Sequence, residues 1–272
     1  MHKFEVPYNF KEGYVEEMVR NHDLIKYIKC TYLPAWKDDA RTTRGEVLFK
    51  PWYPKTFDEY VERLKALNEA GLKPCVLIHK CDHTLDLLQK YYDLGVRRFI
   101  LNDDEAARTF KKDHDVSLTL SITRVAKFDE LTTHDFSMYD DIVLFFFYNR
   151  HLDLIKKLPR KYKYTIIVNE HCYYNCRLYK AHWFVTGETE AEYKKNNDAV
   201  VKKCYELQQK PYRDGIDNDR FTTYIAPQAL AAFDDYIDSY KLVDRNMPTY
   251  RIITELRRYV GYDNYYERTE ES

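Results

Sequence analysis

Eight short runs of aliphatic, aromatic and β-branched residues recur along the chain and predict eight strands. They are Ile25–Thr31, Pro74–His79, Arg98–Asn102, Ser117–Ile122, Ile142–Phe147, Tyr164–Asn169, Thr222–Ala226 and Ser239–Val243. Most of these runs are apolar at nearly every position and do not alternate with polar residues. A continuous apolar run is typical of a parallel strand that is buried on both faces of its sheet.

Segments with apolar residues at helical spacing lie between the predicted strands. Thr56 and Glu59 form a capping box, a common start signal of a helix, ahead of an amphipathic stretch. A later helix is expected to stop at Gly95, and Pro248 is expected to open the last one. The chain therefore alternates between strands and helices.

This alternation predicts an α/β fold, a closed (β/α)8 TIM-type barrel formed by a single domain over residues 1–272. The main alternative is an open doubly wound sheet, but no Gly-x-Gly-x-x-Gly motif follows any of the strands. We expect residues 1–20 to form an N-terminal extension in front of the barrel and residues 262–272 to form a flexible tail.

Composition and charge narrow the classes of partner. The 43 Lys and Arg residues balance 44 Asp and Glu residues, so net charge does not indicate nucleic acid as a partner. The longest apolar run, Ile142–Tyr148, is too short to span a membrane, and the N-terminus lacks an apolar signal segment. Six unevenly spaced cysteines do not form a disulfide framework. A reducing, cytoplasmic location is the expectation.

A cluster of soft ligands follows the sixth predicted strand. Cys172, Cys176 and His182 have the spacing C-x3-C-x5-H, which suits zinc or an iron–sulfur cluster. In (β/α)8 barrels the active site lies at the carboxyl ends of the strands, where this segment is expected. The alternative is two ordinary cysteines in a loop. Cys30, His79 and Cys81 are the candidates for a fourth ligand.

Cationic and amide side chains are also expected near this end of the barrel. The candidate substrate-binding residues are Lys241, Arg245, Asn149, Arg41 and Arg44. Cations gathered at the mouth would favour a carboxylate or phosphate ligand. For Lys241 the alternative is a structural ion pair with Asp103 or Glu170.

Several segments resemble the collagenase-like "peptidase" barrels, the unassigned peptidase family thirty-two. These are Tyr91–Val96 leading into Phe99–Asn102, the closing segment Asp238–Arg245, and the cysteine segment after the sixth predicted strand. The resemblance implies a barrel with a four-cysteine iron–sulfur cluster that catalyses oxygen-independent hydroxylation of tRNA, rRNA or quinone precursors. In this chain the second cysteine comes sooner, His182 stands where a third might be, and Asp244 replaces the glycine of the closing motif.

The resulting expectation is a metal- or iron–sulfur-dependent cytoplasmic barrel enzyme that modifies a small anionic or nucleoside-type substrate and works with a redox partner. The alternative is a non-catalytic binding barrel in which a structural zinc ties down the loop at residues 170–184. Proteolysis is not indicated, because neither Gly-x-Ser-x-Gly nor His-Glu-x-x-His occurs.

Overall fold

A computed structural model describes residues 1–36, 39, 52–172, 176, 178, 181, 190–213, 222–243 and 247–261. The strands are β1 Phe4–Pro7, β2 Ile28–Pro34, β3 Pro74–Ile78, β4 Arg98–Leu101, β5 Ser117–Leu120, β6 Asp141–Val143, β7 Tyr164–Ile167 and β8 Ser239–Lys241. The α-helices are α1 Tyr14–Arg20, α2 His22–Ile25, α4 Phe57–Glu69, α5 Thr84–Asp93, α6 Asp104–Asp113, α7 Phe128–Thr133, α8 Leu152–Ile155, α10 Glu190–Arg213 and α11 Thr249–Tyr259. Short 3-10 helices are η2 Ile122–Arg124, η3 Phe146–Arg150 and η5 Pro227–Ala232.

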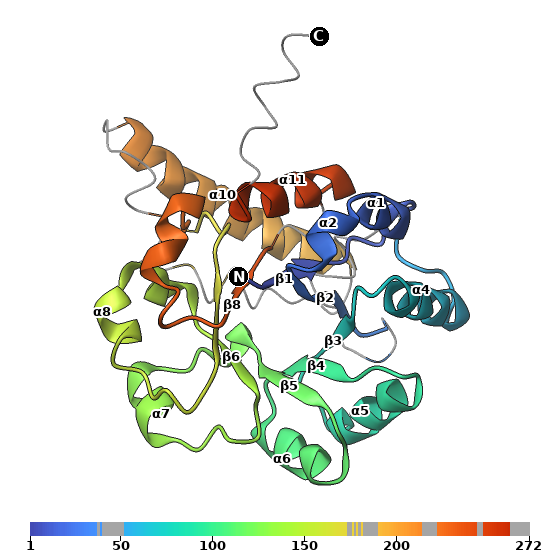
Figure 1. The fold of residues 1–272 in the computed structure, drawn as a ribbon. Helices are drawn as coiled ribbons and strands as arrows, with labels where there is room; N and C mark the ends of the chain where they lie inside the picture. Colours follow the sequence, from blue (N-terminus) through green and yellow to red (C-terminus); the bar gives the residue numbers. More distant parts are fainter. Residues whose placement is uncertain are drawn as a thin grey trace, which may run out of the picture.

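The eight strands form a closed parallel barrel in chain order, from β1 to β8 and back to β1. Figure 1 shows the strands at the centre with helices arranged around them. Closure depends on a short seam in which Glu5 of β1 lies beside Lys241 of β8. The (β/α)8 fold expected from the sequence is confirmed.

Two of the sequence predictions about strands are wrong. The first strand lies at Phe4–Pro7, inside the segment expected to be an N-terminal extension. The predicted strand Thr222–Ala226 is not part of the barrel. It runs as an extended segment beside the end of β7, where the Ile225 amide donates to the Val168 carbonyl group at 2.8 Å. The β-rich sequence of Thr222–Ala226 therefore reflects backbone pairing outside the closed sheet. The strand at Phe4–Pro7 was missed because four residues give too short a pattern to recognise.

Side chains alternate between the inside and the outside of the barrel along each strand, as pleated strands require. On β4, Phe99 and Leu101 belong to the large core between the sheet and the helices, whereas Ile100 belongs to a small interior cluster with Cys30 and Cys75. Continuous apolar runs are explained by this arrangement, because one face packs on helices and the other fills the barrel.

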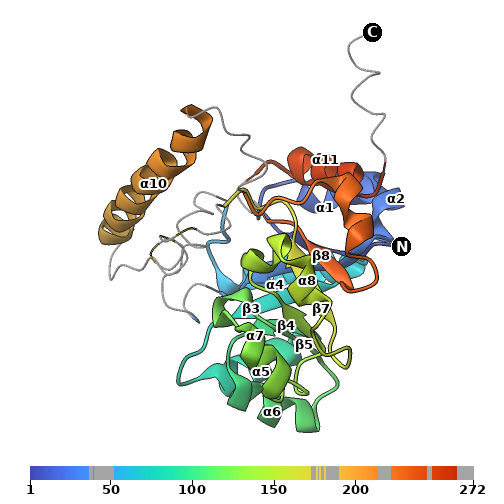
Figure 2. The same cartoon turned by 90° about the vertical axis from the view of Figure 1, so that its left-hand side faces the viewer.

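Helix boundaries follow the local signals in the sequence. The Thr56 hydroxyl group accepts a hydrogen bond from the Glu59 amide at 3.2 Å, which confirms Thr56 as the N-cap of α4, but the Glu59 carboxylate accepts from the Lys55 amide instead of closing the capping box on Thr56. Gly95 follows α5 with a φ of 88°, a backbone conformation that favours glycine. Pro248 is the N-cap residue of α11. Figure 2 shows α10 apart from the ring of helices, on the side opposite the N-terminus.

Among the described residues, no helix combines the length and the apolar character needed to cross a lipid bilayer.

Candidate functional site at the barrel mouth

The carboxyl ends of the parallel strands share one end of the barrel, which we call the mouth. Cys172 comes five residues after the last residue of β7, and Lys241 is the last residue of β8. Both are therefore at the same end, as the sequence analysis required. Cys30 is not at the mouth, because β2 continues to Pro34 and places this thiol inside the barrel beside Cys75.

Cys172 and Cys176, which we call the thiol pair, lie together in the mouth. Both are buried and both are free of disulfides. They belong to one small cluster with Val143 of β6 and Ile167 of β7. The Cys172 carbonyl group accepts a hydrogen bond from the Thr223 amide at 2.8 Å, so the segment paired with the end of β7 also fixes the backbone of this cysteine.

Burial raises the pKa of the Cys172 thiol, and the charge of Glu170 and the hydrogen-bonding contact with Cys176 raise it further. Without a cation the Cys172 thiol therefore stays protonated and is a poor nucleophile. Cys204 of α10 is buried and also contributes to this shift. A bound metal would lower the pKa of the Cys172 thiol, because it favours the deprotonated thiolate.

The thiol pair could supply two of the ligands that a soft metal requires, but it does not complete the coordination. Within the described ranges, no three His, Cys, Asp or Glu side chains come together as a metal-binding group. Zinc and iron–sulfur clusters use about four protein ligands. Further ligands would have to come from elsewhere, and His182, the third ligand predicted from sequence, lies outside the described residues.

Lys241 lies inside the barrel with only 5% of its surface exposed. Its Nζ atom is 2.8 Å from a carboxylate oxygen of Glu5 and 3.9 Å from the ring centroid of Tyr32. The ion pair is therefore made with Glu5, and not with Asp103 or Glu170 as the sequence analysis suggested. An anionic substrate would have to compete with Glu5 for this lysine.

Lys241 and Glu5 belong to a polar cluster in the barrel interior, which we call the interior charge network. The network consists of Glu5, Lys29, Asp141, Thr165, Ser239 and Lys241, all connected by ion pairs or hydrogen bonds. The Nζ atom of Lys29 is 3.2 Å from Glu5 and 2.5 Å from Asp141. Two cations and two carboxylates therefore neutralise each other in the interior.

The ionisation of Glu5 depends on its two lysines. Burial alone would raise the pKa of Glu5, but the charges of Lys241 and Lys29 outweigh burial and hold the pKa at about 2. Burial dominates at Asp141, where it raises the pKa despite the attraction of Lys29. Glu5, Lys29 and Asp141 were not among the residues predicted from the sequence. The signal that could have indicated them was a charged residue next to, or within, a β-rich run.

Asn149, predicted to bind substrate, connects three segments at the mouth. Its buried amide nitrogen donates to the carbonyl groups of Ile167 and Thr223, both at 2.6 Å. Its Oδ1 atom is buried and has no hydrogen-bond partner among the described residues. Asn149 therefore holds η3, the end of β7 and the extended segment together. The remaining candidates, Arg41, Arg44 and Arg245, lie outside the described residues.

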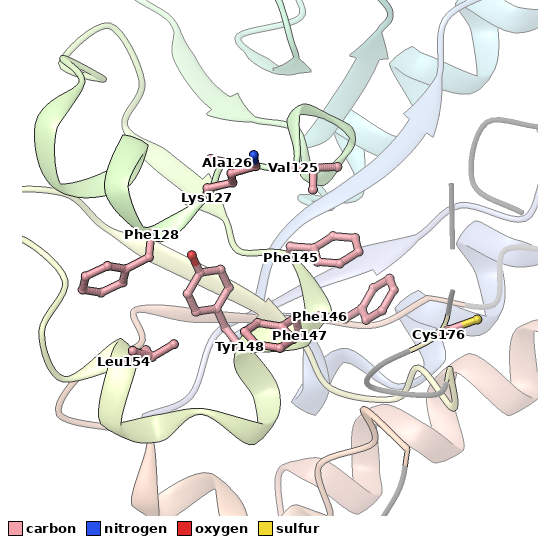
Figure 3. A pocket seen from close by; sticks show the side chains of 10 residues that line it. All are labelled: Val125, Ala126, Lys127, Phe128, Phe145, Phe146, Phe147, Tyr148, Leu154 and Cys176. Carbon is pink, nitrogen blue, oxygen red and sulfur yellow. The ribbon is translucent and has the colours of Figure 1, made fainter. Parts of the chain in front are cut away.

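A cavity of about 330 Å³, which we call the aromatic cavity, opens beside the thiol pair. It is lined by Val125, Ala126, Lys127, Phe128, Phe145, Phe146, Phe147, Tyr148, Leu154 and Cys176 (Figure 3). These residues come mainly from the loops after β5 and β6. The strand predicted over Ile142–Phe147 included Phe145, Phe146 and Phe147, but β6 ends at Val143. The four consecutive aromatic residues Phe145–Tyr148 were the signal of a cavity wall.

Comparison with known proteins supports the fold alone. No protein-family model matches the sequence, and a search of curated proteins finds no match. Among solved structures, the chain is similar to the U32 peptidase Mk0906, with a TM-score of 0.53, 12% identity, and coverage of 90% of this chain and 93% of that chain. It also matches a GH113 β-1,4-mannanase with a TM-score of 0.46, 13% identity, and coverage of 96% and 98%. At 12% identity the first similarity shows a shared barrel fold.

Proposed function

We propose that this chain is a barrel enzyme whose reaction centre lies at the mouth, where Cys172 and Cys176 hold a metal ion or an iron–sulfur cluster. The observation that supports it is the contact between two buried thiols at the carboxyl end of β7, with Cys176 in the wall of a cavity. Barrel enzymes place their chemistry at this end. A centre held here would face a space large enough for a small substrate.

The metal or cluster would supply Lewis-acid or redox chemistry when bound. The chain's own residues would position it and shield it. Thr223 fixes the backbone of Cys172, and Asn149 joins this segment to η3. Phe146 and Ile167 pack against the thiol pair and exclude water from its apolar side. We propose His182 as a further ligand.

The proposal extends to the class of reaction. We propose a distant relationship to the U32 peptidase family, on the segments resembling it and on the structural similarity to Mk0906. If the chain belongs to this family, its reaction would be an oxygen-independent hydroxylation of a small anionic or nucleoside-type molecule, with a redox partner in the cytoplasm. Arg41, Arg44 and Arg245 are proposed as contacts to an anionic group. Lys241 is a weaker candidate, since it already pairs with Glu5.

The second candidate is a non-catalytic binding barrel in which zinc ties down the segment at residues 170–184. It is favoured by the packing of both cysteines in an apolar cluster, which is a feature of a structural site as well. The two candidates differ in the metal that they require.

Anaerobic purification, followed by absorbance spectroscopy and analysis of iron, zinc and acid-labile sulfide, separates the candidates. The reaction-centre proposal predicts a brown protein whose visible absorbance is lost on exposure to air. Colourless protein with stoichiometric zinc would support the binding barrel. Protein free of both metals after metal-supplemented anaerobic expression would contradict both.

A further inference from the structure

The aromatic cavity has features of a binding site that are independent of the metal. Most of its wall is apolar, with four phenylalanines and Leu154 among the lining residues. The rings of Phe145 and Phe146 lie with centroids 4.0 Å apart at an interplanar angle of 36°. In the view of Figure 3 the ring of Tyr148 lies between those of Phe128 and Phe145. Its volume of about 330 Å³ is at the lower end of the range of small-molecule sites.

We propose that the aromatic cavity binds a small aromatic anion, with its flat ring among these side chains and its acidic group at Lys127. As an assignment of substrate class this rests on the proposed function, whereas binding itself does not. Flat rings pack favourably in offset or edge-to-face arrangements against phenylalanine and tyrosine, which an aliphatic ligand cannot do equally well.

Tyr148 supplies a polar group inside the cavity. Its side chain is 4% exposed and lines the cavity. In Figure 3 this hydroxyl points toward the loop of Ala126 and Lys127. Burial, together with the charges of Asp129 and Glu130, raises the pKa of Tyr148 to about 12, so the group is a hydrogen-bond donor at neutral pH. The hydroxyl faces the cavity, where a ligand or a water molecule can accept its hydrogen bond.

Lys127 supplies the charge at the rim. Its side chain is exposed, and its ammonium group forms no ion pair with the described residues. Glu130, the acidic residue three positions further on, pairs with Arg124 at 3.1 Å. Asp129, which like Glu130 lies in the first turn of α7, is the other acidic neighbour. A ligand with one negative group would therefore find at Lys127 a cation that is not already neutralised by contact.

Val125 provides an independent indication that this wall is held in a defined shape. It adopts a φ of 49° and a ψ of 50°, the left-handed region that β-branched residues rarely enter. Strain of this kind collects at ligand-binding and catalytic sites, where the surrounding structure enforces it. The strained residue is followed directly by Ala126, Lys127 and Phe128, all in the cavity wall.

Three matched probes test the class of ligand: 2-naphthoate, its neutral amide 2-naphthamide, and the saturated acid decahydro-2-naphthoate. Titration calorimetry and saturation-transfer NMR on the full chain measure their binding. We expect 2-naphthoate to bind most tightly. Absence of 2-naphthoate binding overturns the proposal. Equal affinity for the amide overturns the role of charge, and equal affinity for the saturated acid overturns the preference for an aromatic ring.

Three variants locate the binding site. Lys127→Gln should weaken 2-naphthoate binding by about two- to fivefold, as expected for an exposed ion pair, and leave 2-naphthamide unaffected. Phe128→Ala, at a half-exposed position, should weaken both aromatic probes by about tenfold. Tyr148→Phe should weaken both probes, because the hydrogen-bond donor that faces the cavity is lost. Lys112→Gln, an exposed lysine on α6, is the control and should bind 2-naphthoate as wild type does.

Unchanged binding in both Lys127→Gln and Phe128→Ala would put the probe elsewhere and overturn the inference. Metal content is measured on the same preparations. Metal-free wild type that still binds 2-naphthoate through Lys127 would remove the proposed reaction centre and keep the cavity as a binding site. Metal-loaded protein that ignores all three probes would remove the cavity inference and keep the reaction centre.

Discussion

The interior charge network and the mouth both contain polar groups inside an apolar barrel. The two regions differ in whether these groups have hydrogen-bond partners. In the network, Glu5 contacts both lysines, and Thr165 and Ser239 supply further hydrogen bonds. At the mouth, the buried Oδ1 atom of Asn149 has no hydrogen-bond partner among the described residues, and the neighbouring Tyr148 faces a cavity. A satisfied network stabilises the closed barrel, whereas an unpartnered polar group close to a cavity indicates a place for a ligand.

Glu5→Gln should be the most damaging change to the network, because it leaves Lys241 without a charged partner in the interior. Breaking one side of a buried ion pair costs about 3–5 kcal/mol. Urea denaturation of wild type and variant at neutral pH measures the free energy of unfolding. Glu12→Gln, an exposed position, is the matched control and should stay within about 0.5 kcal/mol of wild type. A Glu5 variant as stable as its control would show that the network does not stabilise the barrel.

Acid should weaken the network through Glu5. Its pKa is lowered from 4.5 to about 2, so the stability that Glu5 contributes is present above pH 4.5 and is lost as the pH falls toward 2. The raised pKa of Asp141 acts in the opposite direction, since its ionised form is the costly one. The urea midpoint of wild type should therefore fall more steeply over this window than that of Glu5→Gln. Parallel curves would contradict the assignment.

Asn149→Ala should affect the mouth next most strongly. Two buried carbonyl groups, of Ile167 and Thr223, would lose their donor, at a cost of about 2–4 kcal/mol in unfolding free energy. Asn102→Ala serves for comparison, because the Asn102 side chain makes its two hydrogen bonds in a half-buried position, to Lys80 and Thr123. A loss at Asn149 no larger than at Asn102 would show that the connection between β7 and the extended segment is weak.

Val125→Gly should show the smallest effect and the opposite sign. Removing the strain of a left-handed valine gains roughly 1–3 kcal/mol, and the added freedom of glycine costs about 0.5–1, so stability should rise by about 1 kcal/mol. Lys73→Gly, at a φ of 50° far from the cavity, should stabilise similarly. Only the Val125 variant should bind 2-naphthoate less tightly. Unchanged affinity would separate the strain from the function of the wall.

The sequence was sufficient for most of the fold because parallel-barrel strands leave a strong apolar signal. Seven of the predicted runs overlap strands of the barrel, and the signals at Thr56, Gly95 and Pro248 mark helix boundaries in the structure. The strand at Phe4–Pro7 was missed because four residues near a terminus carry little periodicity. Thr222–Ala226 was misassigned because local β-propensity does not reveal which partner an extended segment pairs with.

The site was less accessible from the sequence, because it depends on which side chains meet. The spacing of Cys172 and Cys176 correctly indicated two neighbouring thiols at the mouth. The Glu5 partner of Lys241 is 236 positions away in the chain, and nothing local indicates such a pairing. Likewise the aromatic cavity needs two loops, after β5 and after β6, to come together.

Metal content per chain in wild type and in Cys172→Ser/Cys176→Ser, expressed and purified side by side without oxygen, tests the central claim most directly. Cys75→Ser, which removes a buried thiol of the barrel interior, is the matched control. We predict about one zinc or about four irons per chain in wild type and control, and almost none in the double variant. Equal metal content in the double variant and in wild type, or none in any of the three, would contradict the assignment of the thiol pair.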